Sequence, residues 1–407
     1  MKYTHHCVTT SALEKRLRFL NDVSENGLNA FLNAISRPSS CFYLRINTIK
    51  QEPRAFLEIM RNNHPDLNLD LDPRVPEALK LDVSGPIDIE ESPKKLEVDK
   101  FAAESIMMSA PLYAPGFKTV MKRFKKGDLV SMYHHYRKPG TREDASFLCG
   151  NGVALFDSNQ MHELDKGEIV RTTDSWFFTP RIQDWNEFKQ GILLDQNLPS
   201  MVASIVLNPR AGEHVLDVCA GSGGKTTHLA QLMENKGIVK AVDRNARKIA
   251  LMGERVEKMS ISCVNPIQSK IKHMEKCLED FHPKKVMIDP PCSALGLRPK
   301  LYIDHDEKIL DNFRANQERI WRHVAPFLEP GTQCLYCTCT ILPEENEGVV
   351  ATAMDEHDLK LVEPSLKLGH PGLDWDTLSR NELKKLIRFY PQLDDQVGFF
   401  IAMLEKN

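Results

Sequence analysis

Short apolar runs alternate with amphipathic helical stretches from about residue 177 to the end of the chain. The runs are HVLDV (214–218), GIVKAVD (237–243), KKVMID (284–289), QCLYCT (333–338) and VGFFIAML (397–404). Short runs of this kind, rich in β-branched residues, are typical of buried strands, and strands that alternate with helices form a mostly parallel sheet. The pattern therefore predicts a doubly wound, Rossmann-like α/β domain over residues 177–407.

A glycine-rich turn joins the first of these strands to a helix. It reads CAGSGGKTTH (219–228), and the following residues place Leu229, Leu232 and Met233 on one helical face. Such a turn presents the backbone N–H groups of a helix N-terminus to an acceptor. The turn is therefore expected to bind a ligand; packing of the helix on the sheet, with no ligand, is the plainer alternative.

The spacing within the turn distinguishes three ligands. A P-loop requires glycine at the position of Cys219, and a dinucleotide fingerprint requires a third glycine at the position of Thr226. S-adenosylmethionine occupies the same place in doubly wound sheets and requires only close backbone approach and an acid for its ribose hydroxyls. Asp243 ends the next strand, where that acid is expected. The predicted cofactor-binding residues of the turn are Cys219, Ala220, Gly221, Ser222, Gly223, Gly224 and Lys225.

Two cysteines directly follow later strands of the predicted sheet. Cys292 follows Asp289 and two prolines, and Cys339 stands between two threonines. Strand ends of neighbouring units face one crevice, so we expect both thiols at the site of the methyl donor. Many amino-nitrogen methyltransferases carry an aromatic residue at the place of Cys292. A thiol stacks poorly but is a nucleophile once deprotonated; burial of both cysteines in the core is the alternative.

Two thiols beside a methyl donor predict methylation of a pyrimidine at carbon 5. Addition of a thiolate to carbon 6 makes carbon 5 nucleophilic, and the proton on carbon 5 must leave before the thiol is expelled. Asp289 is expected to hold the exocyclic amine and ring nitrogen of cytosine. An amino-group methyltransferase that uses Asp289 without a covalent step is an alternative, and for it Cys339 would be dispensable.

Residues 96–176 contain short β-like runs broken by Gly, Pro and Asp, which predicts a small β-barrel. Basic residues cluster there, with Tyr113, Tyr133 and Tyr136 interleaved. Cations for phosphates and rings for base stacking are features of RNA-binding surfaces, although an ordinary solvated loop has a similar composition. The predicted RNA-binding residues are Tyr113, Lys122, Lys125, Lys126, Arg137 and Lys138.

Residues 1–95 combine helical stretches with one short strand, CFYLRINT (41–48), and form an N-terminal α+β region. The charged stretch ESPKKLEVDK (91–100) is expected to be a linker. A length of 407 residues fits two or three domains. The net charge of −3 excludes coating of nucleic acid by bulk charge but allows a local basic patch.

No stretch approaches 18 consecutive apolar residues, and the N-terminus lacks the apolar core of a signal peptide, so no membrane segment is expected. The ten cysteines are therefore expected to be reduced, in a cytoplasmic protein. Cys334 and Cys337 form a C-x-x-C pair without the further ligands of a zinc site, so we expect no metal; a redox pair is a weaker alternative.

Together these motifs resemble the Sun-domain (Fmu-type) RNA cytosine-5 methyltransferases. The matching segments follow the family's order and are RINT (45–48), QNLPS (196–200), VLDVCAGSGGKTTH (215–228), AVDR (241–244), IDPPCSALG (288–296), YCTCTILPEENE (336–347), RFYP (388–391) and VGFFIA (397–402). The resemblance implies that Cys339 is the carbon-6 nucleophile and that Cys292 assists proton removal and product release. It also implies that Asp289 positions the cytosine near the methyl donor. By the same analogy Lys225 points into the crevice; a surface lysine at the helix start is the alternative.

The inserted region resembles a PUA domain, an RNA-binding barrel. Its matching segments are LYAPGF (112–117), KKGDLVSMY (125–133), FLCGNGVA (147–154) and GEIVRTTD (167–174). Because it combines a PUA domain with the motifs of this family, the chain resembles the sixth human-type subfamily. Members of that subfamily methylate a cytosine near the 3′ end of the tRNA acceptor stem and related sites in messenger RNA loops. The resemblance implies that the PUA region grips the acceptor stem and its CCA end. We expect the protein to be a monomer. An RNA-binding adaptor with a weakened methyltransferase site is a further alternative.

The sequence departs from the family pattern in three places. Gly221 and Ser222 replace the usual Ala-Pro of the cofactor turn, which loosens the turn because proline fixes φ and glycine frees it. The third cofactor strand, within SCVNPIQSK (262–270), lacks the usual aspartate, and the polar candidates to replace it are Asn265, Gln268 and Ser269. Cys337 stands where a serine is usual, and it either tunes Cys339 or simply packs.

Overall fold

A computed structural model describes residues 3–407 of the chain. The chain forms two compact units that interleave along the sequence. The first unit contains the residues up to Phe42, Asp82–Ile182 and Arg298–His305, and the second contains Tyr43–Leu81, Gln183–Leu297 and Asp306–Asn407. The N-terminal residues are thus divided between the units, and the three regions with boundaries at 95/96 and 176/177 stay a prediction.

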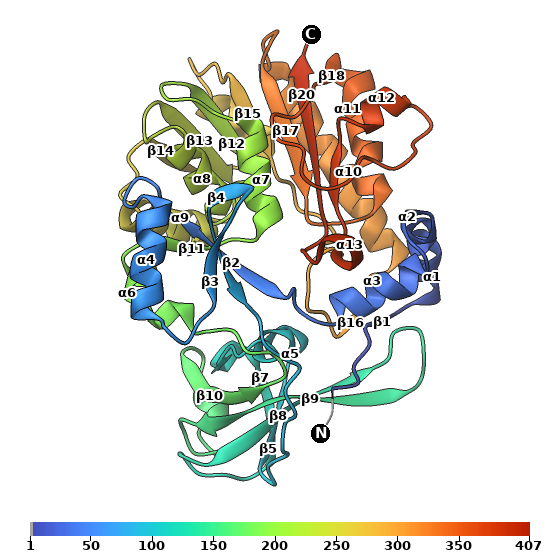
Figure 1. The fold of residues 1–407 in the computed structure, drawn as a ribbon. Coiled ribbons are helices and arrows are strands. Elements are labelled where there is room, and N and C mark those ends of the chain that lie inside the picture. Colours follow the sequence, from blue (N-terminus) through green and yellow to red (C-terminus); the bar gives the residue numbers. More distant parts are fainter. Residues whose placement is uncertain (1–2) are drawn as a thin grey trace. The chain divides into compact units, whose positions relative to one another are not determined.

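The second unit contains the doubly wound sheet that the sequence predicts. Its strands are ordered β14-β13-β12-β15-β17-β20-β18, with β19 paired to β20, and several run side by side in Figure 1. The strands are β12 (His214–Val218), β13 (Ile238–Asp243), β14 (Val264–Gln268), β15 (Lys285–Ile288), β17 (Gln333–Thr338), β18 (Leu359–Leu361), β19 (Ile387–Phe389) and β20 (Phe399–Lys406). The first five strands of the order are parallel, and β20 is antiparallel to β17. Parallel strands place their carboxyl ends at one edge, which is where this fold binds its ligands.

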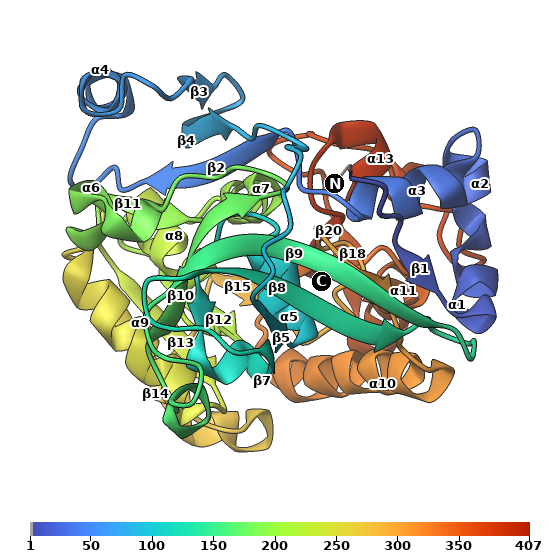
Figure 2. The same cartoon turned by 90° about the horizontal axis from the view of Figure 1, so that it is seen from below.

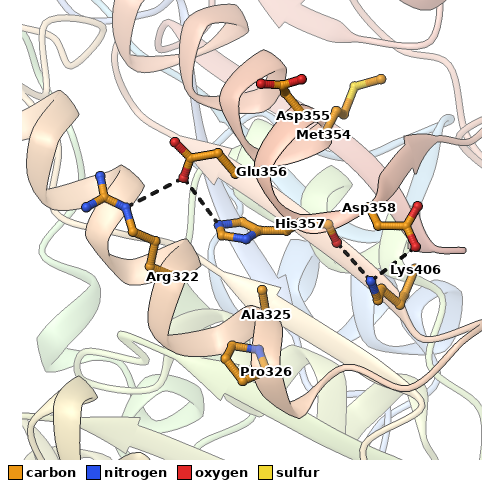
Figure 3. Close-up of a pocket in the computed structure, with 9 residues that line it drawn as sticks. All are labelled: Arg322, Ala325, Pro326, Met354, Asp355, Glu356, His357, Asp358 and Lys406. Carbon is orange, nitrogen blue, oxygen red and sulfur yellow. Dashed lines mark hydrogen bonds and ion pairs between the residues drawn. The ribbon is translucent and has the colours of Figure 1, made fainter.

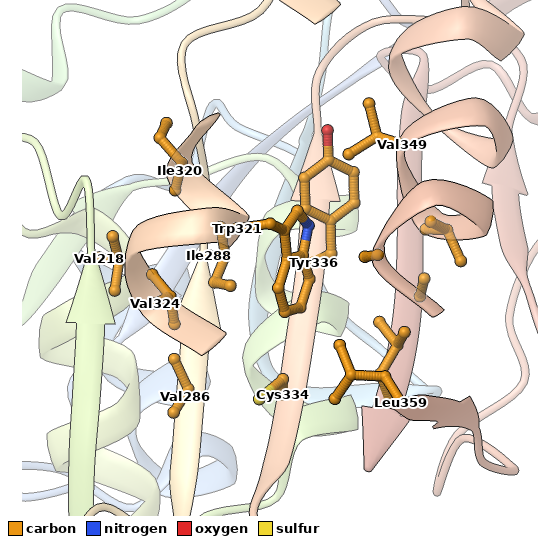
Figure 4. Packing of buried hydrophobic residues seen from close by; sticks show 14 of the residues in the cluster. Val218, Val286, Ile288, Ile320, Trp321, Val324, Cys334, Tyr336, Val349 and Leu359 are labelled. Atoms are coloured by element: carbon orange, nitrogen blue, oxygen red, sulfur yellow. The ribbon is translucent and has the colours of Figure 1, made fainter. Parts of the chain in front are cut away.

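Amphipathic helices bury the faces of this sheet. They are α7 (Leu198–Leu207), α8 (Gly224–Leu232), α9 (Ala246–Lys258), α10 (Glu307–Val324) and α11 (Glu347–His357), with the shorter α6 (Asn186–Lys189), α12 (Arg380–Leu383) and α13 (Pro391–Asp394). Figure 4 shows Trp321 and Val324 of α10 packed beside Val286 of β15 and Tyr336 of β17. Apolar burial of this kind is the main stabilising term for the sheet and helices.

Four strands from distant parts of the sequence form a second, antiparallel sheet in this unit. Its order is β11-β2-β4-β3, and the strands are β2 (Cys41–Ile46), β3 (Leu69–Asp72), β4 (Val75–Asp82) and β11 (Leu193–Asp195). Helix α4 (Pro53–Asn63) follows β2 and begins at a proline, whose fixed φ suits the first position of a helix. The sequence predicts β2 and α4 but not β3 and β4.

The first unit contains a six-stranded sheet ordered β6-β10-β9-β8-β5-β7. The strands are β5 (Lys95–Val98), β6 (Leu112–Tyr113), β7 (Phe117–Lys122), β8 (Leu129–Arg137), β9 (Asp144–Ala154) and β10 (Glu168–Ser175), and α5 (Lys100–Ile106) follows β5. The long antiparallel strands β8 and β9 are visible in Figure 2. The same unit contains α1 (Ser11–Arg16), α2 (Leu20–Val23), α3 (Gly27–Ile35) and the short parallel pair β1 (Val8–Thr9) and β16 (Tyr302–Ile303).

The prediction of a linker at residues 91–100 is wrong. Residues Lys95–Val98 are β5, which pairs with both β7 and β8. Leu96 and Val98 are completely buried in the core of this sheet. Two inward-facing apolar residues are enough to hold a short strand, although the charged residues around them are typical of a linker.

Within residues 3–407, none of the helices combines the length and the apolar character that a bilayer crossing demands.

Candidate active site

The cofactor turn is a compact loop with three residues in the left-handed region. Cys219 has φ of 62°, Gly221 of 60° and Gly223 of 85°. A Cβ on Gly223 would lie 2.6 Å from the Cγ of Met252 on α9, so glycine is required for the turn to pack on that helix. A Cβ on Gly224 would contact nothing within 4 Å, so the first residue of α8 faces open space. The backbone at this point is accessible to a ligand.

Asp243 and the turn lie together, as the sequence predicts. The Gly221 N–H donates to Asp243 Oδ2 at 2.9 Å, and the Asn245 N–H donates to Oδ1 at 2.8 Å. The Ala220 N–H donates to the carbonyl of Val242, one residue before Asp243, at 3.0 Å. These bonds fix the carboxylate at the end of β13 beside the turn.

Asp217 is a buried acid behind the turn that sequence reasoning does not single out. It is 1% exposed, and its Oδ2 accepts a 2.6 Å hydrogen bond from Thr226 Oγ1. Its Oδ1 has no hydrogen-bond partner among the described residues. Burial raises the pKa of Asp217 to about 7.

These features fit S-adenosylmethionine. The helix N-terminus suits a carboxylate, Asp243 suits ribose hydroxyls, and the open space at Gly224 allows close approach of the ligand to the backbone. The unsatisfied oxygen of Asp217 is a further acceptor at the same strand end. Residues 219–225 and Asp243 are therefore the residues that would hold the cofactor.

The third cofactor strand places two of the three polar candidates at the edge of the site. Gln268 is the register partner of Asp243, and the Ser269 N–H donates to the Asp243 carbonyl at 3.0 Å. Asn265 lies opposite Lys240, three residues earlier in the strand. Gln268 and Ser269, rather than Asn265, are thus placed beside the ribose-binding acid.

The structure brings Cys292 and Cys339 together. Cys292 follows β15 and Cys339 follows β17, and these neighbouring parallel strands end in register with Ile288 opposite Tyr336. The two sulfur atoms lie 3.3 Å apart. The convergence follows from the parallel sheet, in which adjacent strands end at the same edge.

Two contacts hold the loops of the two cysteines against each other. Ser293 Oγ and Thr340 Oγ1, each one residue after a cysteine, form a 2.7 Å hydrogen bond. The Gly296 N–H donates to the Cys339 carbonyl at 3.0 Å. The backbone at Gly296 also lies against that of Gly398. A Cβ on Gly296 would lie 2.2 Å from the Gly398 carbonyl oxygen, so glycine is required at position 296.

The buried carboxylate of Glu345 binds the backbone of the Cys292 loop. Its Oε2 accepts from the Ser293 N–H at 3.0 Å and from Gln317 Nε2 at 2.8 Å. It is 1% exposed, and burial raises its pKa. Glu345 lies within the YCTCTILPEENE segment, but no feature of the sequence alone assigns it this position.

Asp289 and Lys225 form an ion pair at the same edge. Lys225 Nζ lies 2.7 Å from Asp289 Oδ2, and the side chains are 14% and 33% exposed. Burial alone would lower the pKa of Lys225, but the charge of Asp289, with smaller contributions from Cys337 and Cys339, outweighs it and raises that pKa. Lys225 therefore lies in the crevice and is not a surface lysine.

Cys337 contacts Asp289. Its sulfur lies 3.7 Å from Asp289 Oδ1, the carboxylate oxygen that Lys225 does not bind. Burial raises the pKa of the Cys337 thiol well above its usual range, so it is a protonated donor. Cys334 lies in the core, three residues earlier. Residues three apart in a strand face opposite sides of the sheet, which separates the two thiols of the C-x-x-C pair.

The pKa of Cys292 is raised well above its usual range by its hydrogen bond to Cys339, by burial and by the charges of Cys339 and Glu345. Cys292 is therefore the neutral thiol of the pair. Interaction with Cys339 raises the pKa of Lys225, and by reciprocity the Lys225 ammonium favours a thiolate at Cys339. The electrostatics thus distinguish two thiols that have the same chemistry in isolation.

Arg45 supports the first turn of α8 from β2. This arginine is fully buried, donates to the Gly224 carbonyl at 2.8 Å and to Thr227 Oγ1 at 2.7 Å, and also bonds Gln196. Burial lowers its pKa to about 9. Arg45 belongs to the RINT segment, and sequence reasoning gave it no role.

The predicted RNA-binding residues have mixed surroundings in the first unit. Tyr113 is 50% exposed on β6, and Lys122 is exposed at the end of β7. Several of the cations already have acidic partners: Lys125 with Asp157, Arg137 with Asp144 and Lys138 with Glu143, while the exposed Lys126 bonds Asp157 through its backbone N–H.

Tyr133 and Tyr136 are not exposed platforms, which corrects the expectation for the interleaved tyrosines. Tyr133 is 8% exposed and belongs to the core. Tyr136 is half-buried and stacks on Tyr302, with ring centroids 4.7 Å apart. Phe101, in the first turn of α5, is 78% exposed and is a ring that sequence reasoning missed.

A surface pocket of about 700 Å³ in the second unit is lined by residues at the C-terminal ends of α10 and α11 (Figure 3). Ion pairs cross it, between Arg322 and Glu356 and between Lys406 and Asp358. The pocket contains none of the site residues described above.

The second unit combines a parallel doubly wound sheet with a glycine-rich turn, an acid placed for ribose and two thiols beside an Asp-Pro-Pro sequence. This combination defines a methyltransferase that uses S-adenosylmethionine. Comparison with known proteins extends this assignment. Residues 204–405 match the family described as 16S rRNA methyltransferase RsmB/F, and residues 94–175 match the PUA domain.

Full-length relatives agree with this match. A tRNA (cytosine(72)-C(5))-methyltransferase of Pyrococcus horikoshii is 33% identical over 402 residues, with 97% of each chain covered. The tRNA (cytosine(72)-C(5))-methyltransferase NSUN6 of Homo sapiens is 27% identical, over 94% of this chain and 92% of the relative. The chain belongs to the RsmB/F family of RNA cytosine-5 methyltransferases, whose methyl donor is S-adenosylmethionine.

A solved structure gives the same result. The crystal structure of NSun6 from Pyrococcus horikoshii with SFG, an analogue of S-adenosylmethionine, matches with a TM-score of 0.80 and 32% identity. The match covers 96% of this chain and 97% of that one. The resemblance inferred from the sequence motifs, including the PUA domain and the cofactor, is confirmed.

Proposed function

We propose that this chain converts a cytosine near the 3′ end of the tRNA acceptor stem, the one numbered 72, to 5-methylcytosine. The observation that carries the chemistry is the pair of thiols 3.3 Å apart beside Asp289. The substrate is supported by the two full-length relatives, both named for cytosine 72 of tRNA. Messenger RNA loops that present a cytosine in a similar shape are a second substrate class.

In this mechanism the Cys339 thiolate adds to carbon 6 of the cytosine and forms a carbon–sulfur bond. A positive charge favours a nearby thiolate, and Cys339 is one of the groups that interact with the Lys225 ammonium. Asp289 accepts from the exocyclic amine and favours protonation of the ring nitrogen as negative charge builds on the ring, because its carboxylate then accepts from that N–H as well. Lys225 and Cys337 hold its two carboxylate oxygens and fix its orientation.

Bound S-adenosylmethionine supplies an electrophilic methyl group to carbon 5. Release then requires loss of the proton on carbon 5 and of the bond to Cys339. Cys292 holds a neutral thiol 3.3 Å from the Cys339 sulfur, so it gives its proton to that sulfur as the carbon–sulfur bond breaks, and the Cys292 sulfur then takes the proton that leaves carbon 5. Ser293 and Thr340 keep the two sulfurs within this distance.

We infer that the PUA region binds the acceptor stem and its CCA end. Tyr113 and Phe101 are exposed rings in the first unit, and stacking on aromatic side chains is how proteins hold unpaired bases. Lys122, Lys125, Lys126, Arg137 and Lys138 supply cations for the phosphates. Several of these cations exchange a carboxylate partner for a phosphate on binding.

The proposal includes a monomer in the cytoplasm. Sulfur atoms 3.3 Å apart would be joined in an oxidising compartment, and the mechanism requires both as thiols. A reducing compartment is therefore consistent with the chemistry. Gel filtration with light scattering and localisation of the tagged protein test these two points.

The direct test is to incubate the protein with tritiated S-adenosylmethionine and transcribed tRNA, beside Cys339→Ala and Cys292→Ala. We expect label in RNA with wild type, none with Cys339→Ala, and a trapped protein–RNA adduct with Cys292→Ala. Nucleoside mass spectrometry assigns 5-methylcytosine, and label that survives Cys339→Ala would favour an amino-nitrogen target. RNA binding by wild type without any label would favour the adaptor alternative.

The RNA specificity is tested with matched transcripts. A tRNA whose cytosine 72 is replaced by uridine should accept no label, and one that lacks the CCA end should accept far less. A messenger RNA stem-loop with an unpaired cytosine tests the second substrate class. Equal labelling of the intact tRNA and the tRNA without CCA would contradict the role of the PUA region.

A further inference from the structure

The tip of the cofactor turn has little intrinsic rigidity. Gly221 has φ of 60°, and a Cβ there would meet nothing closer than the Cys219 carbonyl oxygen at 4.0 Å. Ser222 follows it, without the ring of a proline to fix φ. Because glycine is the residue with the most conformational freedom, this segment must be held by contacts from elsewhere if it is to bind a ligand.

Arg255 makes such a contact from the neighbouring helix. Its Nη1 donates to the Ser222 carbonyl at 2.7 Å and lies 3.3 Å from Ser222 Oγ. Arg255 is half-buried in the last turn of α9. Burial lowers its pKa and the charge of Asp195 opposes that shift, so the guanidinium is held charged beside the turn.

Helix α9 is itself firmly placed. Met252 packs where a Cβ on Gly223 would lie. At the C-terminal end of the helix, the Met259 carbonyl accepts from Asn47 Nδ2 at 2.9 Å and the Lys258 carbonyl accepts from Lys50 Nζ at 2.7 Å. An arginine that extends from a helix held at its middle and at its C-terminal end provides a rigid support for a flexible loop.

We propose that Arg255 is a positioning residue for the cofactor: its hydrogen bond to the Ser222 carbonyl orders the turn that binds S-adenosylmethionine and replaces the constraint that a proline would supply. The inference rests on the proposed cofactor site. Without Arg255 the turn samples other conformations, and the binding-competent one is only a fraction of the population, which weakens apparent affinity by that fraction.

The experiment measures the Kd of S-adenosylmethionine and of SFG by calorimetry for the full chain without RNA. We expect Arg255→Ala to raise Kd about tenfold, the effect of losing one charge-assisted hydrogen bond. Lys258→Ala, which removes a cation one turn later where it covers the Phe188 ring, is the matched control and should leave Kd unchanged. A Kd for Arg255→Ala within twofold of wild type would overturn the proposal.

Two further measurements separate positioning from a general loss of structure. Ser222→Pro added to Arg255→Ala should recover most of the lost affinity, because it restores the constraint without the arginine. Hydrogen exchange of the cofactor-free protein should show faster exchange at Gly221, whose N–H bonds Asp243, in Arg255→Ala alone. Unchanged exchange, or a uniform increase with a lower Tm and no recovery by proline, would contradict positioning.

The wild-type titration distinguishes this inference from the proposed function. If wild type binds neither ligand, the cofactor site itself is wrong. If wild type binds and Arg255→Ala binds equally well, only the role of Arg255 fails.

Discussion

Lys225 and Asp289 are 64 residues apart in the chain, yet the ammonium of one lies 2.7 Å from the carboxylate of the other. The first belongs to the glycine-rich turn and the second to the loop that contains Cys292. Their ion pair thus connects the proposed site of the methyl donor with the proposed site of the cytosine.

Lys225→Met, which removes the charge and keeps the length, should lower kcat about 30- to 100-fold. The reason is the loss of a hydrogen bond to a charged group that orients Asp289, worth roughly 2–3 kcal/mol. Single-turnover methylation at saturating cofactor and tRNA measures the effect. The kcat of Lys225→Arg should fall between those of wild type and Lys225→Met. A wild-type rate for Lys225→Met would show that Asp289 needs no partner.

Ser293→Ala and Thr340→Val should each slow single-turnover methylation about fivefold, because one buried hydrogen bond, worth about 1 kcal/mol, holds the two thiol loops together. The double variant should lose no more than either single variant, since both remove the same bond. Additive losses would mean that the two hydroxyls act separately.

Asp217 predicts a specific pH dependence of stability. Burial raises its pKa in the folded protein to about 7, whereas an exposed carboxyl titrates near about 4. The unfolded chain therefore loses its proton first, and the cost of burying Asp217 grows as pH rises from about 4 to about 7 and is then constant.

Asp217→Asn should consequently stabilise the fold most above pH 7, by up to about 4 kcal/mol, with a benefit that shrinks toward pH 4. Denaturant unfolding at several pH values, with wild type at each pH as reference, checks this. Asp376→Asn, at an exposed acid, is the matched control. A benefit that grows toward low pH would contradict the assignment.

Tyr113→Ala should raise KM for tRNA roughly tenfold and leave the Kd of the cofactor unchanged. Base–aromatic stacking is worth about 1–3 kcal/mol, and Tyr113 is half exposed in the PUA region. Tyr113→Phe, which keeps the ring, should restore most of the affinity. Met121→Ala, at another exposed apolar residue, should have little effect.

The sequence predicts those residues of the site that directly follow a strand of the parallel sheet. Cys292, Cys339 and the cofactor turn converge because each follows a parallel strand, and parallel strands end together. Asp243 meets the turn for the same reason. Local patterns in the chain are sufficient for such residues.

Residues whose partners are remote could not be predicted in this way. Arg45 lies 179 residues from Gly224, and nothing in the RINT segment indicates that contact. Glu345 and Arg255 are likewise ordinary charged residues until the fold places them against the Ser293 amide and the Ser222 carbonyl. Tyr133 resembles an RNA-facing ring in the sequence, but its strand is packed on both faces.

The interleaving of the two compact units has a consequence for how the chain is made. The backbone passes from one unit to the other five times, after residues 42, 81, 182, 297 and 305. Neither unit is therefore a continuous piece that can be cut out and expressed alone. During synthesis the RNA-binding unit lacks β16 until residue 303 has left the ribosome, and the catalytic sheet lacks β20 until synthesis is almost complete. Neither unit can therefore be completed until late in translation.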